Sequence, residues 1–120
     1  EDEYQISAKT YALFFRILYN ATLLNRDMSE YALEVLAKTK FSKALRAGIP
    51  HNIPLAHKYG IRVLPDENAG HAIELSDCGI VYHKVRPYLL CIMTQGKDPE
   101  ILASFIADTA EMVNEAIMHE

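Results

Sequence analysis

Two segments in the first third of the chain place apolar residues at the three-to-four spacing that is typical of amphipathic helices. The first segment follows Ser7, whose hydroxyl suits a helix N-cap, and it is expected to end near Tyr19 or Asn20. The second opens at Asn25 and carries Asp27 in its first turn, where a negative charge interacts favourably with the helix dipole. The apolar stripes of the two predicted helices are Tyr11, Phe14, Phe15 and Leu18, and then Met28, Tyr31, Ala32, Val35 and Leu36.

The segment that follows contains residues that end helices. A short helical turn over residues 42–47 should stop at Gly48, because glycine is common directly after a helix. Pro50 and Pro54 then bracket a passage that cannot be helical.

Beyond Leu55 the pattern changes to that of β-strands separated by turn-forming residues. The run Leu89-Leu90-Cys91-Ile92-Met93 is apolar on both faces, so we expect both faces of the sheet to be covered. The predicted order is a strand over 55–63, a turn over 65–70, a strand from 71 or 72 to 81 or 82 with a bend considered at 76–77, a hairpin turn over 83–87 and a strand over 88–94.

A last helix is predicted from Asp98-Pro99-Glu100, which combines a cap, a proline at the first helical position and an acid in the first turn. Helices, then three antiparallel strands, then a helix give the α+β fold class. The 120 residues lie in the usual size range of a single domain, and an apolar half is enough to build a core. We therefore treat residues 1–120 as one unit.

Composition and charge argue against several classes of protein. No run of about eighteen apolar residues is present, so we predict no membrane span. The net charge is −4 and the basic residues are scattered, which gives no electrostatic reason to expect nucleic acid. The start, Glu1-Asp2-Glu3, is the opposite of a signal peptide. The histidines show no metal-ligand spacing, so we predict no metal site and interpret them as turn and surface residues: His51, His57, His71, His83 and His119.

The two cysteines, Cys78 and Cys91, are too few for a disulfide scaffold, and both lie in apolar, strand-like runs. We interpret them first as buried thiols, and a cross-strand disulfide is the second interpretation. A thiol nucleophile needs a base and partial exposure, and the apolar surroundings of Cys91 do not favour that role.

Candidate chemistry is concentrated in Ala56-His57-Lys58-Tyr59-Gly60, a Lys-x-Gly on a short apolar strand. Taken alone, Lys58 is more simply a solvated strand lysine. No serine is followed by lysine three residues later or by asparagine two residues later, so neither Ser-x-x-Lys nor Ser-x-Asn occurs. Ser76-Asp77-Cys78 partly matches Ser-Asp-Asn, but cysteine cannot replace the amide, and we interpret it as structural. The sequence therefore provides one wall of a candidate active site without a nucleophile.

Four segments of the sequence, taken together and in this order, are informative: Phe15-Arg16-Ile17-Leu18-Tyr19-Asn20-Ala21-Thr22, Ala56-His57-Lys58-Tyr59-Gly60, Asp77-Cys78-Gly79-Ile80-Val81-Tyr82 and Pro87-Tyr88-Leu89-Leu90-Cys91-Ile92-Met93-Thr94. With them the chain resembles the C-terminal part of class A β-lactamases and related penicillin-binding-protein-like serine hydrolases. This resemblance covers nearly the whole chain and somewhat under half of a complete family domain. It implies an antiparallel three-stranded sheet with packed helices, as part of the β-lactamase/transpeptidase-like fold, and no cofactor.

The resemblance also implies roles for the residues around the Lys-x-Gly. Lys58 would place its ammonium near the nucleophile and the substrate carboxylate, where it lowers the cost of developing negative charge. Gly60 would let the substrate backbone lie close to the strand. The backbone N–H of Ile61 would be one oxyanion-hole donor.

Two positions depart from the pattern of that family. Tyr59 stands where threonine or serine is usual, and the hydroxyl of that residue binds the substrate carboxylate. His57 stands where an aspartate often precedes the lysine, so the usual carboxylate partner of Arg46 would be missing.

The sequence leads to two hypotheses about function, which belong to different classes. The chain is a C-terminal fragment of a serine hydrolase, inactive alone and extracytoplasmic (periplasmic or secreted) by resemblance, or it is a stand-alone, non-catalytic module for assembly or ligand binding. In the resembled fold the strand over 88–94 is internal and pairs with a strand from the N-terminal part. An uncovered apolar edge promotes pairing with another chain. We therefore expect either the missing N-terminal segment or a homo-oligomer to cover it; the alternative is that residues 1–120 rearrange so that the sheet closes internally.

Overall fold

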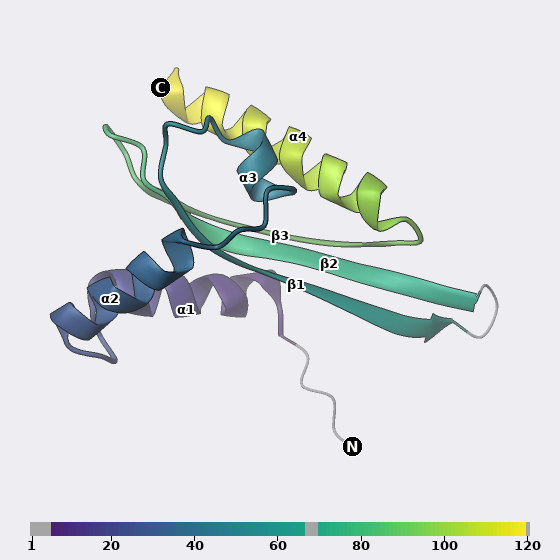
Figure 1. The fold of residues 1–120 in the computed structure, drawn as a ribbon, viewed down its shortest axis with the longest axis horizontal. Helices are drawn as coiled ribbons and strands as arrows, with labels where there is room; N and C mark the ends of the chain where they lie inside the picture. The colour runs from purple at the N-terminus through teal and green to yellow at the C-terminus, as the bar shows by residue number, and fades with distance from the viewer. Residues whose placement is uncertain (1–5, 67–69, 120) are drawn as a thin grey trace.

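An antiparallel sheet separates two pairs of helices in the computed structural model, which describes residues 6–66 and 70–119 (Figure 1). One face of the sheet is covered by α1 and α2, and the other by α3 and α4. This three-layer arrangement confirms the predicted α+β class and the covering of both sheet faces. In chain order the described elements are α1 (Ala8–Asn20), α2 (Arg26–Ala37), α3 (Leu45–Gly48), β1 (Leu55–Asp66), β2 (Gly70–Val81), β3 (Tyr88–Gly96) and α4 (Pro99–Met118).

The longer helices begin where their capping residues predict. Ser7 accepts a hydrogen bond from the backbone N–H of Thr10 at the start of α1, and Asn25 accepts one from that of Met28 at the start of α2. Asp98 caps α4 in the same way. These side chains satisfy N–H groups that have no partner within the helix.

The strands are longer than the sequence suggests: residues 65, 66 and 70 of the predicted turn belong to strands, and residues 67–69 of that prediction lie outside the described residues. Pairing continues from Leu55 opposite Val81 to Asp66 opposite Gly70, so Pro65 belongs to β1. The order is β1-β2-β3, which makes β1 an edge strand of the described sheet. Proline is tolerated on an edge strand where its missing N–H faces away from the neighbour.

The short helix α3 corrects the prediction of a turn over 42–47. It begins only at Leu45, because Ala44 has a φ of 55°, outside the right-handed helical region. Gly48 is its last residue, not the residue after it. A Cβ at Gly48 would stand 2.1 Å from the carbonyl oxygen of Ala107, so only glycine permits this approach of α3 to α4.

Two apolar cores lie on opposite faces of the sheet. Between the sheet and α3/α4, one core includes Leu45, Leu55 and Ile106, all nearly inaccessible to solvent. Between the sheet and α1/α2, the other includes Phe15 and Ala56. The alternation of side chains along a strand assigns consecutive residues such as Leu55 and Ala56 to different cores.

Cys78 and Cys91 form a disulfide between β2 and β3. Our first interpretation of them as buried thiols was therefore wrong, and the second was right. The two residues are direct cross-strand partners, and Cys78 is fully buried in the core beneath α1. The sequence pattern alone could not distinguish the two interpretations, because it did not determine which residues of β2 and β3 lie opposite each other.

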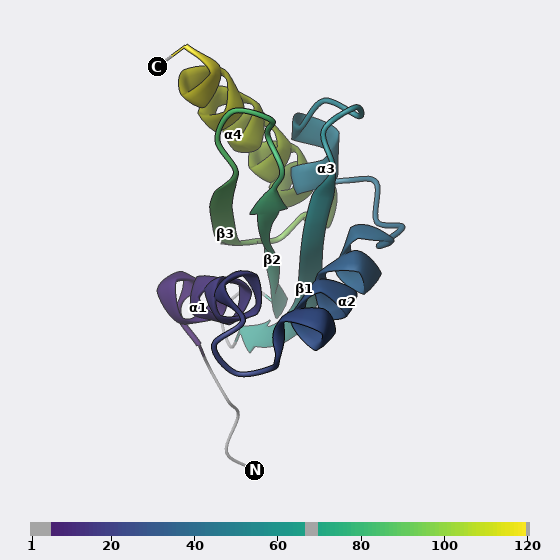
Figure 2. The same cartoon turned by 90° about the vertical axis from the view of Figure 1, so that its left-hand side faces the viewer.

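The elements on the β3 side of the molecule, α1, β3 and α4, carry several exposed large apolar side chains. In Figure 2, β3 lies at one side of the sheet, with α1 below it and α4 above it. Exposed apolar residues of these elements include Leu13, Phe14, Leu89, Met93 and Phe105. Among the described residues, no helix combines the length and apolar character that crossing a membrane requires.

Candidate active site

Side chains of β1 alternate between the two faces of the sheet, and this divides the Lys-x-Gly residues. Ala56 packs in the α1/α2 core, so Lys58 and Gly60 belong to the same face. Leu55 packs in the α3/α4 core, so Tyr59 belongs to the opposite face. The predicted site residues are contiguous on one strand but do not all face one space.

The Lys58 side chain is exposed and bends around the outer edge of β1. Its Nζ donates a hydrogen bond of 2.8 Å to the backbone carbonyl of Tyr59 and lies 5.0 Å from the centre of the Tyr59 ring. The ammonium is therefore at the free edge of the strand, in contact with solvent.

The Tyr59 ring stacks on Phe41, with the ring centres 3.9 Å apart and the planes 19° from parallel. Phe41 belongs to the segment between α2 and α3 and packs against the α3/α4 core. This contact holds the phenol on the sheet face opposite Gly60. A tyrosine at this position therefore contributes packing that a small hydroxyl residue would not.

The backbone N–H of Ile61 points toward the free edge of β1. Hydrogen-bonded and non-hydrogen-bonded pairs alternate along an antiparallel ladder. Tyr82 N–H donates to Pro54 O, which makes 54 and 82 a bonded pair and directs the even-numbered residues of β1 toward β2. The odd-numbered Ile61 thus directs its N–H and C=O outward. The carbonyls of His57 and Tyr59 follow the same rule, since Thr39 and Lys58 bind them from outside.

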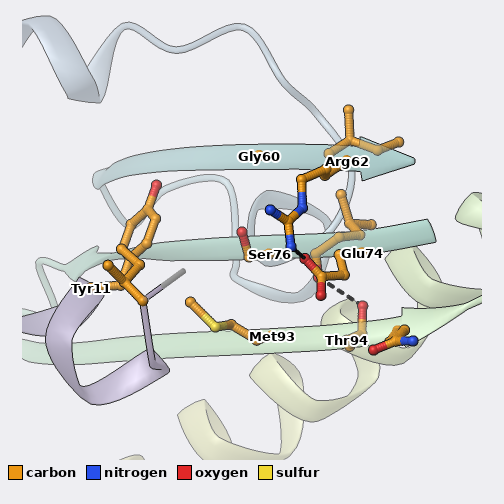
Figure 3. Close-up of a pocket in the computed structure, with 11 residues that line it drawn as sticks. Tyr11, Gly60, Arg62, Glu74, Ser76, Met93 and Thr94 are labelled. Carbon is orange, nitrogen blue, oxygen red and sulfur yellow. Dashed lines mark hydrogen bonds and ion pairs between the residues drawn. The ribbon is translucent and has the colours of Figure 1, made fainter. Parts of the chain in front are cut away.

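A hollow of about 430 Å³ opens on the α1/α2 face beside Gly60. Gly60 of β1, Ser76 of β2 and Met93 of β3 form one row across its floor, and Ser76 Oγ lies 3.5 Å from the position that a Cβ on Gly60 would take (Figure 3). The next row contains an ion pair of 3.1 Å between Arg62 and Glu74. The hollow therefore offers hydroxyl, charged and apolar groups within reach of the candidate strand.

Tyr11 is a residue of this site that the sequence did not reveal. Its regular spacing in α1 indicated a core position, and it does pack in the α1/α2 core and stack on Phe15. However, its hydroxyl also donates a hydrogen bond of 3.1 Å to the backbone carbonyl of Lys58, and the ring lines the hollow (Figure 3). No local signal could have paired a residue of α1 with a carbonyl of β1.

The start of the candidate strand is anchored by a buried network. His57 and Asp77 are almost completely buried, which corrects our interpretation of His57 as a turn or surface residue. Asp77 Oδ1 lies 3.0 Å from His57 Nδ1, and Asp77 Oδ2 accepts a hydrogen bond of 3.1 Å from the backbone N–H of Leu45. A buried carboxylate with these partners fixes the backbone directly before Lys58 to α3.

Arg46 binds main-chain carbonyls. It donates to the carbonyl oxygens of Ile49, Pro50 and Ile53 at 3.1, 2.7 and 3.1 Å. Burial lowers the pKa of this guanidinium from its usual value. Within the described part of the chain, no three His, Cys, Asp or Glu side chains gather in a way that could hold a metal ion.

Comparison with known proteins gives a consistent assignment of the fold. A sequence profile described as "Beta-lactamase2: Beta-lactamase enzyme family" matches residues 1–117. No curated protein sequence matches the chain. Among solved structures, PBP-A is similar with a TM-score of 0.72 and 18% identity, over 91% of this chain and 38% of that one.

Two further structures agree. A mutant of PBP-A, solved as an acyl-enzyme complex with penicillin G, has a TM-score of 0.72 and 20% identity over 91% of this chain and 39% of its own. A crystal structure of the TLA-1 extended-spectrum β-lactamase has a TM-score of 0.69 and 17% identity over 85% of this chain and 38% of its own. The chain thus spans well under half the length of the structures that it resembles.

Proposed function

Because this chain belongs to the β-lactamase enzyme family, we propose that it forms the C-terminal, cleft-bordering part of a serine hydrolase and supplies no nucleophile itself. The rest of the domain carries the serine, which is acylated by the substrate and released by water. A mutant of PBP-A forms an acyl-enzyme with penicillin G. The proposed substrates are accordingly β-lactams or related acyl compounds.

The observation that carries this proposal is the arrangement along the free edge of β1. Lys58 brings a cation to that edge, Gly60 leaves the adjoining face open, and the Ile61 N–H points outward. A cation and a backbone donor close together stabilise the negative charge that develops on an acyl oxygen. In this proposal Lys58 and Ile61 have the catalytic roles.

Gly60 and Tyr59 are proposed as substrate-binding residues that contribute to binding in different ways. Gly60 admits the substrate backbone because a side chain there would occupy the hollow. Tyr59 acts through its backbone and through the edge that its ring stabilises, since the ring itself is stacked on Phe41. The usual recognition of a substrate carboxylate by a small hydroxyl residue is therefore changed in this protein.

The first prediction is that this chain alone forms no acyl-enzyme. None of its serines has a lysine three residues later, so the usual activated nucleophile is missing. The purified chain should neither hydrolyse a chromogenic cephalosporin nor react with a fluorophosphonate probe, as read by intact mass. TLA-1 β-lactamase is the positive control for the cephalosporin assay, and a serine hydrolase that reacts with the probe is the control for labelling. Stoichiometric labelling of one serine would contradict the prediction.

The alternative function is a stand-alone, non-catalytic module for assembly or ligand binding. The coding sequence upstream of Glu1 discriminates between the two. A Ser-x-x-Lys encoded in frame upstream supports the hydrolase, whereas a start codon next to Glu1 supports the module.

We further propose that the remainder of the family domain covers the β3 side. The matched part is 38% of PBP-A, and the elements on this side expose Leu13, Phe14, Leu89 and Phe105. Apolar surface next to a strand edge favours association. The second prediction is therefore that this chain alone self-associates at micromolar concentration. Sedimentation velocity should show a dimer or larger species, and a well-folded monomer would contradict the prediction.

An extracytoplasmic location is proposed on two grounds. The first ground is the family to which the chain belongs. The second is the disulfide between Cys78 and Cys91, because disulfides persist in oxidising compartments.

A further inference from the structure

We propose that Tyr11 is a positioning residue of the candidate active site, which sets the conformation of the Lys58–Ile61 strip through its hydrogen bond to the Lys58 carbonyl. This inference rests on the proposed function and adds α1 to the elements that control it. The bond joins residues 47 positions apart and is 3.1 Å long.

The Tyr11 ring is held firmly enough for its hydroxyl to position a backbone group. It packs in the core that also contains Phe15 and the buried Cys78, and it stacks on Phe15 with the ring centres 6.3 Å apart. In the sheet register, Lys58 lies opposite Cys78, which the disulfide joins to β3. The donor and the strand that it contacts are thus both fixed by the same core.

The hydroxyl of Tyr11 is also suited to remain a donor. Burial, and secondarily the negative charge of Asp77, raise its pKa above the usual value for tyrosine. The phenol is therefore protonated at neutral pH. The Lys58 carbonyl belongs to the peptide unit that links Lys58 to Tyr59. Gly60 and the outward N–H of Ile61 come next along the chain. A shift of the carbonyl is transmitted to them along the backbone.

The hydrogen bond between Tyr11 and Lys58 matters for a substrate because it lies beside the hollow. Tyr11 forms one wall and Gly60 part of the floor, with Ser76 beside it (Figure 3). Loss of the bond would leave the ring and the pairing of Lys58 with Cys78 in place, but it would remove the contact that sets the orientation of the Lys58 carbonyl beside the space where the substrate is proposed to lie. Catalysis depends on small displacements at such positions.

The test compares Tyr11→Phe with Tyr19→Phe, which removes a hydroxyl from an exposed tyrosine of the same helix. NMR spectra of the isotope-labelled chain report the carbonyl carbon of Lys58 and the amides of Tyr59, Gly60 and Ile61. In Tyr11→Phe these four resonances should shift while circular dichroism stays unchanged; in Tyr19→Phe they should not. If they are unchanged in a folded Tyr11→Phe, or if Tyr19→Phe moves them equally, the inference is wrong.

A kinetic arm uses the full-length protein that contains this chain. Tyr11→Phe should lower kcat about tenfold, roughly the effect of one hydrogen bond, with KM within about twofold. An unchanged kcat in an active protein would overturn the inference. A full-length protein without any hydrolase activity would refute the proposed function instead. The NMR comparison would still decide whether Tyr11 sets the conformation of the Lys58–Ile61 strip.

Discussion

Replacing Lys58 by alanine in the full-length protein is expected to lower kcat/KM by about two orders of magnitude, as loss of a preorganised electrostatic group typically does. The ammonium lies on the Tyr59 carbonyl at the free edge of β1, the same edge toward which the N–H of Ile61 points. Its removal takes away a positive charge without disturbing a core, because the side chain is exposed. Initial rates with a chromogenic cephalosporin measure the change.

Two further variants show whether the loss comes from this charge. Lys84→Ala removes an exposed lysine from the connection between β2 and β3 and should leave kcat/KM unchanged. Lys58→Arg keeps the charge but replaces a compact ammonium by a planar guanidinium, so it should recover only part of the activity. Equal kcat/KM for Lys58→Ala and wild type would refute the role proposed for Lys58.

The second large effect is expected on stability. Asp77→Ala should lower the free energy of unfolding of this chain by about 3 kcal/mol, because it removes a buried carboxylate that His57 and the Leu45 N–H both contact. The loss leaves a buried backbone donor without its partner. Urea unfolding followed by circular dichroism measures the change.

Matched substitutions separate this network from a general effect of lost charge. Asp77→Asn keeps an oxygen for the Leu45 N–H and should cost less than alanine. Asp108→Ala, on the exposed part of α4, should stay within about 0.5 kcal/mol of wild type. If Asp77→Ala is as stable as Asp108→Ala, the network does not stabilise the fold.

Local signals in the sequence were enough to predict the helix starts. Ser7, Asn25 and Asp98 each act through a side chain and a backbone N–H two or three residues later. The strand lengths were not predictable in the same way. Turn-forming residues near Pro65 favoured an early end, whereas the cross-strand pairing continues to Asp66.

The candidate site was predicted as a segment but not as a geometry. The sequence segment around Lys58 located the strand. The alternation of side chains along a strand was enough to place Tyr59 and Gly60 on opposite faces of the sheet. The partners that decide the arrangement, Tyr11 and Phe41, lie on other elements. Contacts of this kind depend on how the layers pack, for which a single sequence carries no local pattern.

The edge position of β1 has a consequence for what can add to the sheet there. Outward backbone groups alternate along this edge, but the carbonyls of His57 and Tyr59 are occupied by Thr39 and Lys58, and Pro65 has no N–H to offer. Between these positions, Ile61 and Val63 of the described β1 present both an outward N–H and an outward C=O. An incoming strand would find too few partners to extend into a ladder, so this edge resists the open-ended pairing that leads to aggregation, while still admitting a ligand one or two residues long.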